Sequence, residues 1–142
     1  MEPWVTDGTV AGTRMIRDIY PGAGPSYPSG FTAMNGSVYF SASDPVIGGQ
    51  LWRTDGTEAG TSLVRIISPA GSYPTWITAV GDVLYFAASD PVNGNELWTS
   101  DGTAAGTVLV KDIAPGPSSS NPSGFTAGGS VVYFVANDGV HG

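Results

Sequence analysis

Short apolar runs, separated by breaks rich in glycine and proline, recur along the whole chain. In the central part, residues 76–80 and 83–88 are mostly apolar and flank a Gly-Asp pair at residues 81–82. Two turn residues that include a glycine favour a tight β-hairpin, because the right-handed twist of the strands requires positive φ in the turn. Further strands are expected over residues 96–100 and 108–113, joined by an Asp-Gly-Thr turn. The pattern predicts a four-stranded antiparallel meander.

The same pattern occurs three times with a period of about 47 residues. Tyr-Phe pairs begin at residues 39, 85 and 133, and tryptophans stand at 4, 52 and 98. Runs such as residues 84–88 are apolar on both strand faces, which indicates sheets that are covered on both sides. A repeat of this length with four antiparallel strands is typical of a β-propeller blade. The predicted fold is therefore an all-β propeller.

The chain is expected to begin and end inside a blade. A half-blade covers residues 1–19, intact blades cover about 31–67 and 76–113, and a second half-blade covers about 125–142, all in one repeat domain. Gly142 lies nine residues after Tyr133, so Met1 continues the repeat count without a gap. The two ends are therefore predicted to be complementary halves of one blade.

Three blades are too few to close a ring alone, since propellers usually have four to eight. An open arc would also leave bare strand edges and apolar faces at its ends. We expect the chain to pair with copies of itself, most simply as a homodimer that forms a six-bladed ring. A homotrimeric nine-bladed ring is the alternative.

Composition limits the possible partners. The 142 residues include 21 glycines and 11 prolines, no cysteine, and 12 acidic against 5 basic residues, for a formal charge of −7. This charge repels phosphate groups, which argues against nucleic acid and anionic membranes as partners. No apolar run approaches the ~20 residues of a membrane-spanning helix, and the N-terminus lacks a signal-peptide pattern. The absence of cysteine leaves the compartment undetermined.

Asp7, Asp55 and Asp101 each precede a Gly-Thr pair. A carboxylate in this position accepts hydrogen bonds from turn amides, so these residues are interpreted as structural. A calcium-binding loop is the alternative, although each turn offers only one carboxylate where calcium takes six to eight oxygen ligands.

A second set of aspartates, Asp44, Asp90 and Asp138, lies in the loops between second and third strands. Turn stabilisation is again the favoured interpretation, and cation binding is best supported at Asp90, which has Asn93 and Glu96 nearby. The single histidine, His141, lies in the last of these loops without a carboxylate or nucleophile at motif spacing, and is interpreted as a surface loop residue. No catalytic residues are assigned, and the chain is predicted not to be an enzyme.

The proline-rich loops carry Tyr27, Tyr73 and Asn121. In a four-stranded meander these loops emerge on the same side as the loops of Asp44, Asp90, Asp138 and His141. Aromatic, amide and carboxylate groups on one face can bind a glycan or a peptide, so a lectin-like or peptide-binding module is a second hypothesis. Packing of tyrosine against the turn is the competing interpretation.

Recurring tryptophans in a repeat protein usually pack between neighbouring units. We therefore expect Trp4, Trp52 and Trp98 to have this structural role. Trp76 is equated with Phe31 and Phe125 of the other repeats and is likewise expected in the core.

The segment from residue 96 onward, ELWTSDGTAAGT, and its copies resemble the ELWxxDGT repeat family of bacterial proteins. The resemblance covers nearly the whole chain, with Pro3 in place of leucine and Gln50 in place of glutamate. It implies a β-propeller-like repeat protein of a secreted or cell-surface type and supplies no catalytic residue. Three repeats that start with methionine suggest a natural fragment, an engineered protein or an unusually short member. The favoured function is a non-enzymatic, self-assembling scaffold or interaction module.

Overall fold

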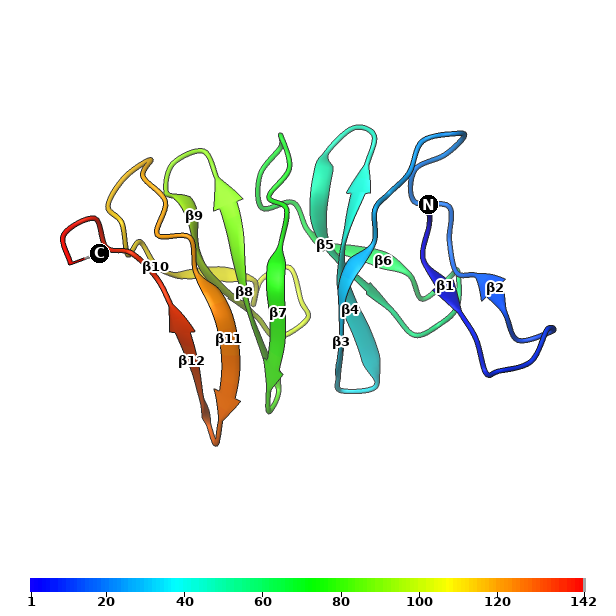
Figure 1. The fold of residues 1–142 in the computed structure, drawn as a ribbon. Coiled ribbons are helices and arrows are strands. Elements are labelled where there is room, and N and C mark those ends of the chain that lie inside the picture. Colours follow the sequence, from blue (N-terminus) through cyan, green and yellow to red (C-terminus); the bar gives the residue numbers. More distant parts are fainter. Residues whose placement is uncertain (142) are drawn as a thin grey trace.

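Short β-strands joined by tight turns build the described chain (Figure 1). The computed structural model describes residues 1–141; Gly142, the last residue of the expected C-terminal half-blade, lies outside the described residues. Over residues 1–141 there is no helix of the length and apolarity needed to cross a membrane. The strands are β1 Trp4–Val5, β2 Arg14–Met15, β3 Ser29–Met34, β4 Ser37–Asp44, β5 Gly48–Thr54, β6 Ser62–Arg65, β7 Thr75–Val80, β8 Val83–Asp90, β9 Gly94–Ser100, β10 Val108–Lys111, β11 Ser123–Gly128 and β12 Val131–Val135.

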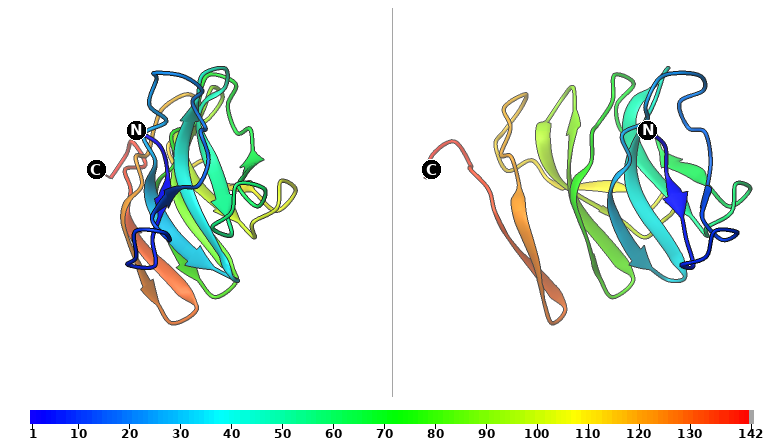
Figure 2. Two further views of the ribbon diagram at one scale, coloured as in Figure 1. Left: turned by 90° about the vertical axis from the view of Figure 1, so that its right-hand side faces the viewer. Right: turned by 45° about the vertical axis from the view of Figure 1, so that its right-hand side comes forward.

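These strands form four antiparallel sheets. Two full sheets, β3–β6 and β7–β10, each contain four strands in sequential order, whereas the N-terminal pair β1–β2 and the C-terminal pair β11–β12 contain two strands each. The four sheets stand side by side in chain order, with the two pairs at opposite ends of the row (Figures 1 and 2). The prediction of an all-β chain built from four-stranded antiparallel meanders is confirmed.

The hairpin turns have the backbone that the glycine-containing pairs predict. Asn35 and Gly36 both adopt positive φ, of 50° and 75°, as a type I′ turn requires. The resulting register places Phe40 opposite Trp52 in the first full sheet and Phe86 opposite Trp98 in the second.

The expected position of Trp76 in the core is wrong. A β-bulge between Thr75 and Thr78 places Ile77, rather than Trp76, on the buried face, and Trp76 is 55% exposed with φ of 59°. The corresponding residues of the other repeats are Gly30 and Gly124, which also have positive φ. A shift of one residue in a strand moves a side chain to the opposite face, so an alignment error of one residue exchanged core and surface.

The strand boundaries differ from the expected ones most clearly at β10. It ends at Lys111 instead of residue 113, because the Ile113 N–H donates to Glu96 Oε2 and does not continue the ladder with β9. The expected strands at 76–80, 83–88 and 96–100 are each observed and extend by up to two residues.

The apolar cores lie between neighbouring sheets. Tyr39 and Leu51 of the first full sheet pack with Phe86 and Trp98 of the second, while Phe40 and Trp52 pack with Ile19 from the segment after β2. Trp52 and Trp98 are therefore buried between sheets, as expected. The two ends of the row differ: Trp4 is 60% exposed where Trp52 is 6% exposed, and Tyr133 is 66% exposed where Tyr39 is 4% exposed. Large apolar side chains are thus left uncovered at both ends of the row.

Candidate functional site

A buried acidic side chain holds the proline-rich loop that leaves the second full sheet. Glu96 is fully buried, and its carboxylate accepts hydrogen bonds from the Ser120 N–H (2.8 Å), the Ser120 hydroxyl (2.5 Å) and the Ile113 N–H (3.1 Å). The Ala114 N–H also donates to it, at 3.4 Å. The carboxylate oxygens are therefore occupied by backbone and serine donors, which corrects the interpretation of Glu96 as a candidate cation ligand.

The same arrangement recurs at Glu2 and Gln50. Glu2 accepts from the backbone N–H groups of Ile19 and Ser26 and from the Ser26 hydroxyl. Gln50 accepts through Oε1 from Ser72, while its Nε2 donates to the carbonyls of Ile47 and Ser68. The amide thus replaces a carboxylate by finding acceptors for its extra hydrogens. Sequence reasoning missed this site, although the period places Ser26, Ser72 and Ser120 at equivalent positions.

Each of these serines also binds the sheet that follows. The carbonyls of Ser26, Ser72 and Ser120 accept from the N–H groups of Ser43 (2.7 Å), Ser89 (2.9 Å) and Asn137 (2.9 Å). A single serine in each loop therefore connects the sheet the chain leaves with the sheet it enters. This contact also brings the proline-rich loops beside the ends of the second strands.

The aspartates of the Asp-Gly-Thr turns act within their turns. Asp7, Asp55 and Asp101 each accept from the backbone N–H and the hydroxyl of the threonine two residues later, at 2.7 to 2.9 Å. These hydrogen bonds lower the pKa of each carboxyl group. A Cβ built on Gly60 would overlap the Asp55 carboxylate, which explains the glycine of the following Gly-Thr pair. This is the turn chemistry that the sequence predicts.

The loops between second and third strands are closed by their own aspartates. Asp44 accepts from the Val46 N–H, at 2.7 Å. Burial opposes ionisation of Asp90, but hydrogen bonds from Asn93 and the Val92 backbone outweigh it, so the pKa of Asp90 lies below its ordinary value. No group of three acidic or histidine side chains within residues 1–141 is arranged to hold a metal ion. The Asn93 side-chain amide donates to Asp90 Oδ2 at 2.9 Å, while the Glu96 carboxylate is occupied by its own donors.

His141 lies against the aspartate of the last loop. Its Nδ1 is 2.7 Å from Asp138 Oδ2, and this hydrogen bond is the main cause that lowers the pKa of Asp138 to about 2. Both side chains are solvent-accessible, and His141 is the more exposed of the two. The pair closes the loop between Asp138 and His141, so the expectation that no carboxylate accompanies this histidine is wrong.

The candidate binding residues of the proline-rich loops share an unusual backbone. Tyr27, Tyr73 and Asn121 all have φ between 46° and 49°, and each precedes a proline. A Cβ on Gly49 would meet the Tyr73 ring, which therefore packs closely on this glycine. Tyr27 and Tyr73 remain more than half exposed. The three residues occupy equivalent positions in separate loops, and the structure does not gather them around one cavity.

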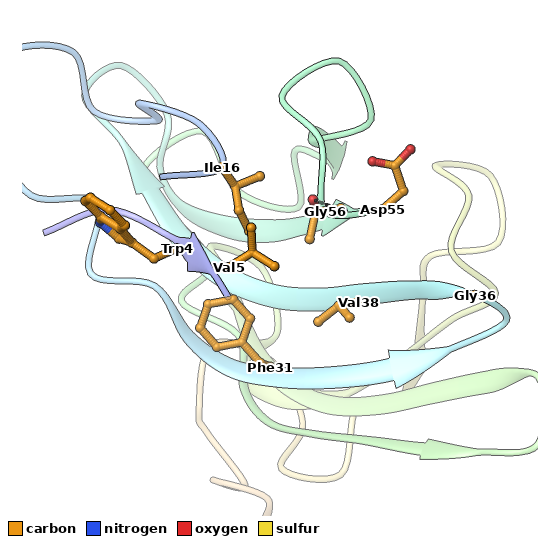
Figure 3. A pocket seen from close by; sticks show the side chains of 9 residues that line it. Trp4, Val5, Ile16, Phe31, Gly36, Val38, Asp55 and Gly56 are labelled. Atoms are coloured by element: carbon orange, nitrogen blue, oxygen red, sulfur yellow. Dashed lines mark hydrogen bonds between the residues drawn. The ribbon is translucent and has the colours of Figure 1, made fainter. Parts of the chain in front are cut away.

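An apolar cleft lies elsewhere, between the N-terminal pair and the first full sheet (Figure 3). Its volume is about 310 Å³. It is lined by Trp4, Val5, Ile16, Phe31, Gly36, Val38, Thr54, Asp55 and Gly56. A second cleft, of about 250 Å³, is more polar and lies beside Arg53 and Gly102. Neither cleft is lined by the tyrosines, aspartates or histidine that sequence reasoning selected for the loop face.

The chain matches no protein-family model, no curated protein and no solved structure. Its function is therefore argued from its geometry.

Proposed function

We propose that the protein is a self-assembling, non-enzymatic β-propeller scaffold, in which the C-terminal pair of one copy and the N-terminal pair of another form a single blade. One observation carries this proposal: the two incomplete sheets are complementary. By the repeat spacing, β11 and β12 correspond to the first and second strands of a full sheet, whereas β1 and β2 correspond to the third and fourth. Joined edge to edge, they supply all four strands.

The register of the full sheets defines the proposed junction. Phe40 opposes Trp52, and Phe86 opposes Trp98. The same register places Phe134 of one copy opposite Trp4 of the other. Within residues 1–141, β1 pairs only with β2 and β12 only with β11, so the two edges that this junction needs are open. Pairing satisfies backbone groups and covers apolar side chains at once.

Two copies joined at both ends contain six blades, which lies within the usual range for propellers. The proposed assembly is therefore a homodimer with two identical junctions. Glycan or peptide binding on the loop face has no comparable observation behind it.

Solution mass tests the proposal directly. We expect sedimentation equilibrium of the 142-residue chain to give twice its mass of 14.5 kDa. A threefold mass would indicate nine blades and contradict the dimer, and a monomer at all concentrations would contradict assembly.

A matched pair of substitutions distinguishes strand pairing at the proposed junction from non-specific hydrophobic association. Val135 and Val92 are similarly exposed, but only Val135 lies on the open face of β12. Val135→Lys is expected to give a folded monomer, because a charge would be buried at the junction. Val92→Lys is expected to leave the mass unchanged, and equal effects of both substitutions would contradict the proposed junction.

A further inference from the structure

Within the chain, a tyrosine of the first full sheet packs on a glycine of the second. Tyr39 is almost fully buried and belongs to the same core cluster as Ile77 and Leu84. A Cβ built on Gly102 would overlap Tyr39 Oη, so only glycine leaves room for the phenol group there. The tyrosine ring therefore occupies a pocket, here called the tyrosine pocket, formed by Ile77, Leu84 and Gly102.

The first full sheet has an equivalent tyrosine pocket, but no described side chain occupies it. The residues 46 positions earlier are Phe31, Val38 and Gly56, and all three line the apolar cleft (Figure 3). Phe31 is 50% exposed where Ile77 is 8% exposed. Gly56 has φ of 91°, close to the 90° of Gly102, yet a Cβ at Gly56 meets no described atom within 4 Å. The pocket of the first full sheet is thus built from equivalent positions to that of the second, but no residue of the described chain takes the place of Tyr39.

The repeat identifies the missing side chain. Tyr39 stands in the second strand of the preceding sheet, and the sheet that precedes the cleft, the N-terminal pair, consists of third and fourth strands only. The second strand that would complete this pair is equivalent to β12, in which Tyr133 corresponds to Tyr39. Tyr133 is 66% exposed, and its strand β12 lies at the opposite end of the row from β1 and β2 (Figure 1). It therefore cannot be supplied by the same copy.

We propose that the apolar cleft is the socket for Tyr133 of a second copy, with the phenol ring between Phe31 and Val38 and its hydroxyl above Gly56. This inference rests on the proposed assembly and adds the side chain that anchors it. Only two polar side chains line the cleft, those of Thr54 and Asp55, which suits an aromatic ring with one polar end. A buried aromatic anchor in a pocket is the usual source of most of an interface's binding energy.

The dissociation constant of the dimer tests the socket. Tyr133→Ala is expected to raise it about a hundredfold or more, because two sockets per dimer lose their anchors. Tyr133→Phe keeps the ring and is expected to change it by less than about tenfold. Tyr73→Ala, which removes a comparably exposed tyrosine from the loop between the two full sheets, is the control and is expected to leave it unchanged. A dimer of Tyr133→Ala as tight as the wild type would overturn the inference.

Photo-cross-linking tests where the side chain at position 133 binds, even if Tyr133→Ala fails to fold. With p-benzoylphenylalanine at position 133 and a mixture of isotope-labelled and unlabelled chains, we expect intermolecular links to the tryptic fragments 18–53 and 54–65, which contain Phe31, Val38 and Gly56. Links only to other fragments, or only within one copy, would overturn the inference. If the wild-type protein is a dimer but links to fragments 18–53 and 54–65 are absent, the proposed assembly still holds and only the role of Tyr133 is wrong. If the wild-type protein is a monomer, both the proposed assembly and this inference are wrong.

Discussion

Trp76 has a backbone conformation that is unfavourable for a residue with a side chain. It occupies the bulge position of β7 with φ of 59°, where the other two repeats have glycine. A left-handed backbone costs a residue with a Cβ roughly 1–2 kcal/mol. The ring is 55% exposed, and burial of the rest of its surface offsets part of this cost.

Trp76→Gly is therefore expected to be more stable than Trp76→Ala, by about 0.5–1 kcal/mol once the greater freedom of glycine in the unfolded chain is included, because both variants lose the ring and only glycine suits the backbone. Urea denaturation at fixed protein concentration measures the change. Trp76→Ala is the control, because it removes the ring and keeps the unfavourable backbone. Equal stability of the two variants, or a less stable Trp76→Gly, would show that the backbone at position 76 is not strained.

At this scale, sequence reasoning succeeded where chemistry is local. The hydrogen bonds of Asp55 to its own turn follow from residue type and spacing alone. It failed for Trp76 because this residue was matched to Phe31 and Phe125 by its aromatic type, although the bulge lies at the same place in all three repeats. Counting nine residues back from Phe86, as from Phe40 to Phe31, would have selected Ile77 as the core residue.

The most consequential contact between elements is the one made by Glu96. This single side chain accepts from groups in the segment after β10 and in the loop before β11, so it sets how consecutive sheets are joined. The sequence marks the residue as recurrent, but its role depends on burial, and an acidic residue in a glycine-rich segment looks exposed. Its closeness in sequence to Asp90 and Asn93 is what suggests a cation ligand instead.

Glu96→Ala is expected to lower the free energy of unfolding by about 3 kcal/mol or more, because several buried donors lose their acceptor. Glu96→Gln is expected to cost less, about 1–2 kcal/mol, since Gln50 shows that an amide can be accommodated at this position. Urea denaturation provides the measurement, with Glu58→Ala, at an exposed position, as the control. A loss in Glu96→Ala no larger than in the control would contradict this role.

The sequence predicts the fold class of the whole molecule better than it predicts the contacts between its sheets. Glycine-containing turns and apolar runs define the hairpins locally, and the period then gives the order of strands in β3–β6 and β7–β10. The apolar cleft was not predictable in the same way. Uncovered apolar faces at the ends of the row follow from the predicted half-blades, but the sequence does not show that Phe31, Val38 and Gly56 line one cleft there.

Assembly should be visible in backbone amide exchange. In isolated chains the outer pairs, β1–β2 and β11–β12, are expected to exchange fastest, because every strand in them has an unpaired edge and they bury little apolar surface. Raising the concentration above the dissociation constant should protect these four strands and leave β8, in the middle of a full sheet, unchanged. Mass spectrometry of exchanged peptides at two concentrations measures this, and concentration-independent exchange in the outer pairs would contradict assembly through them.

The complementarity of the two incomplete sheets has a consequence for size. A junction between unlike ends is head-to-tail, and such contacts by themselves set no limit on the number of subunits. Whether copies close on themselves or grow into a filament then depends on the angle between adjacent sheets. Substitutions in the layer between sheets, around Phe40 and Phe86, can therefore change the number of copies without touching either end.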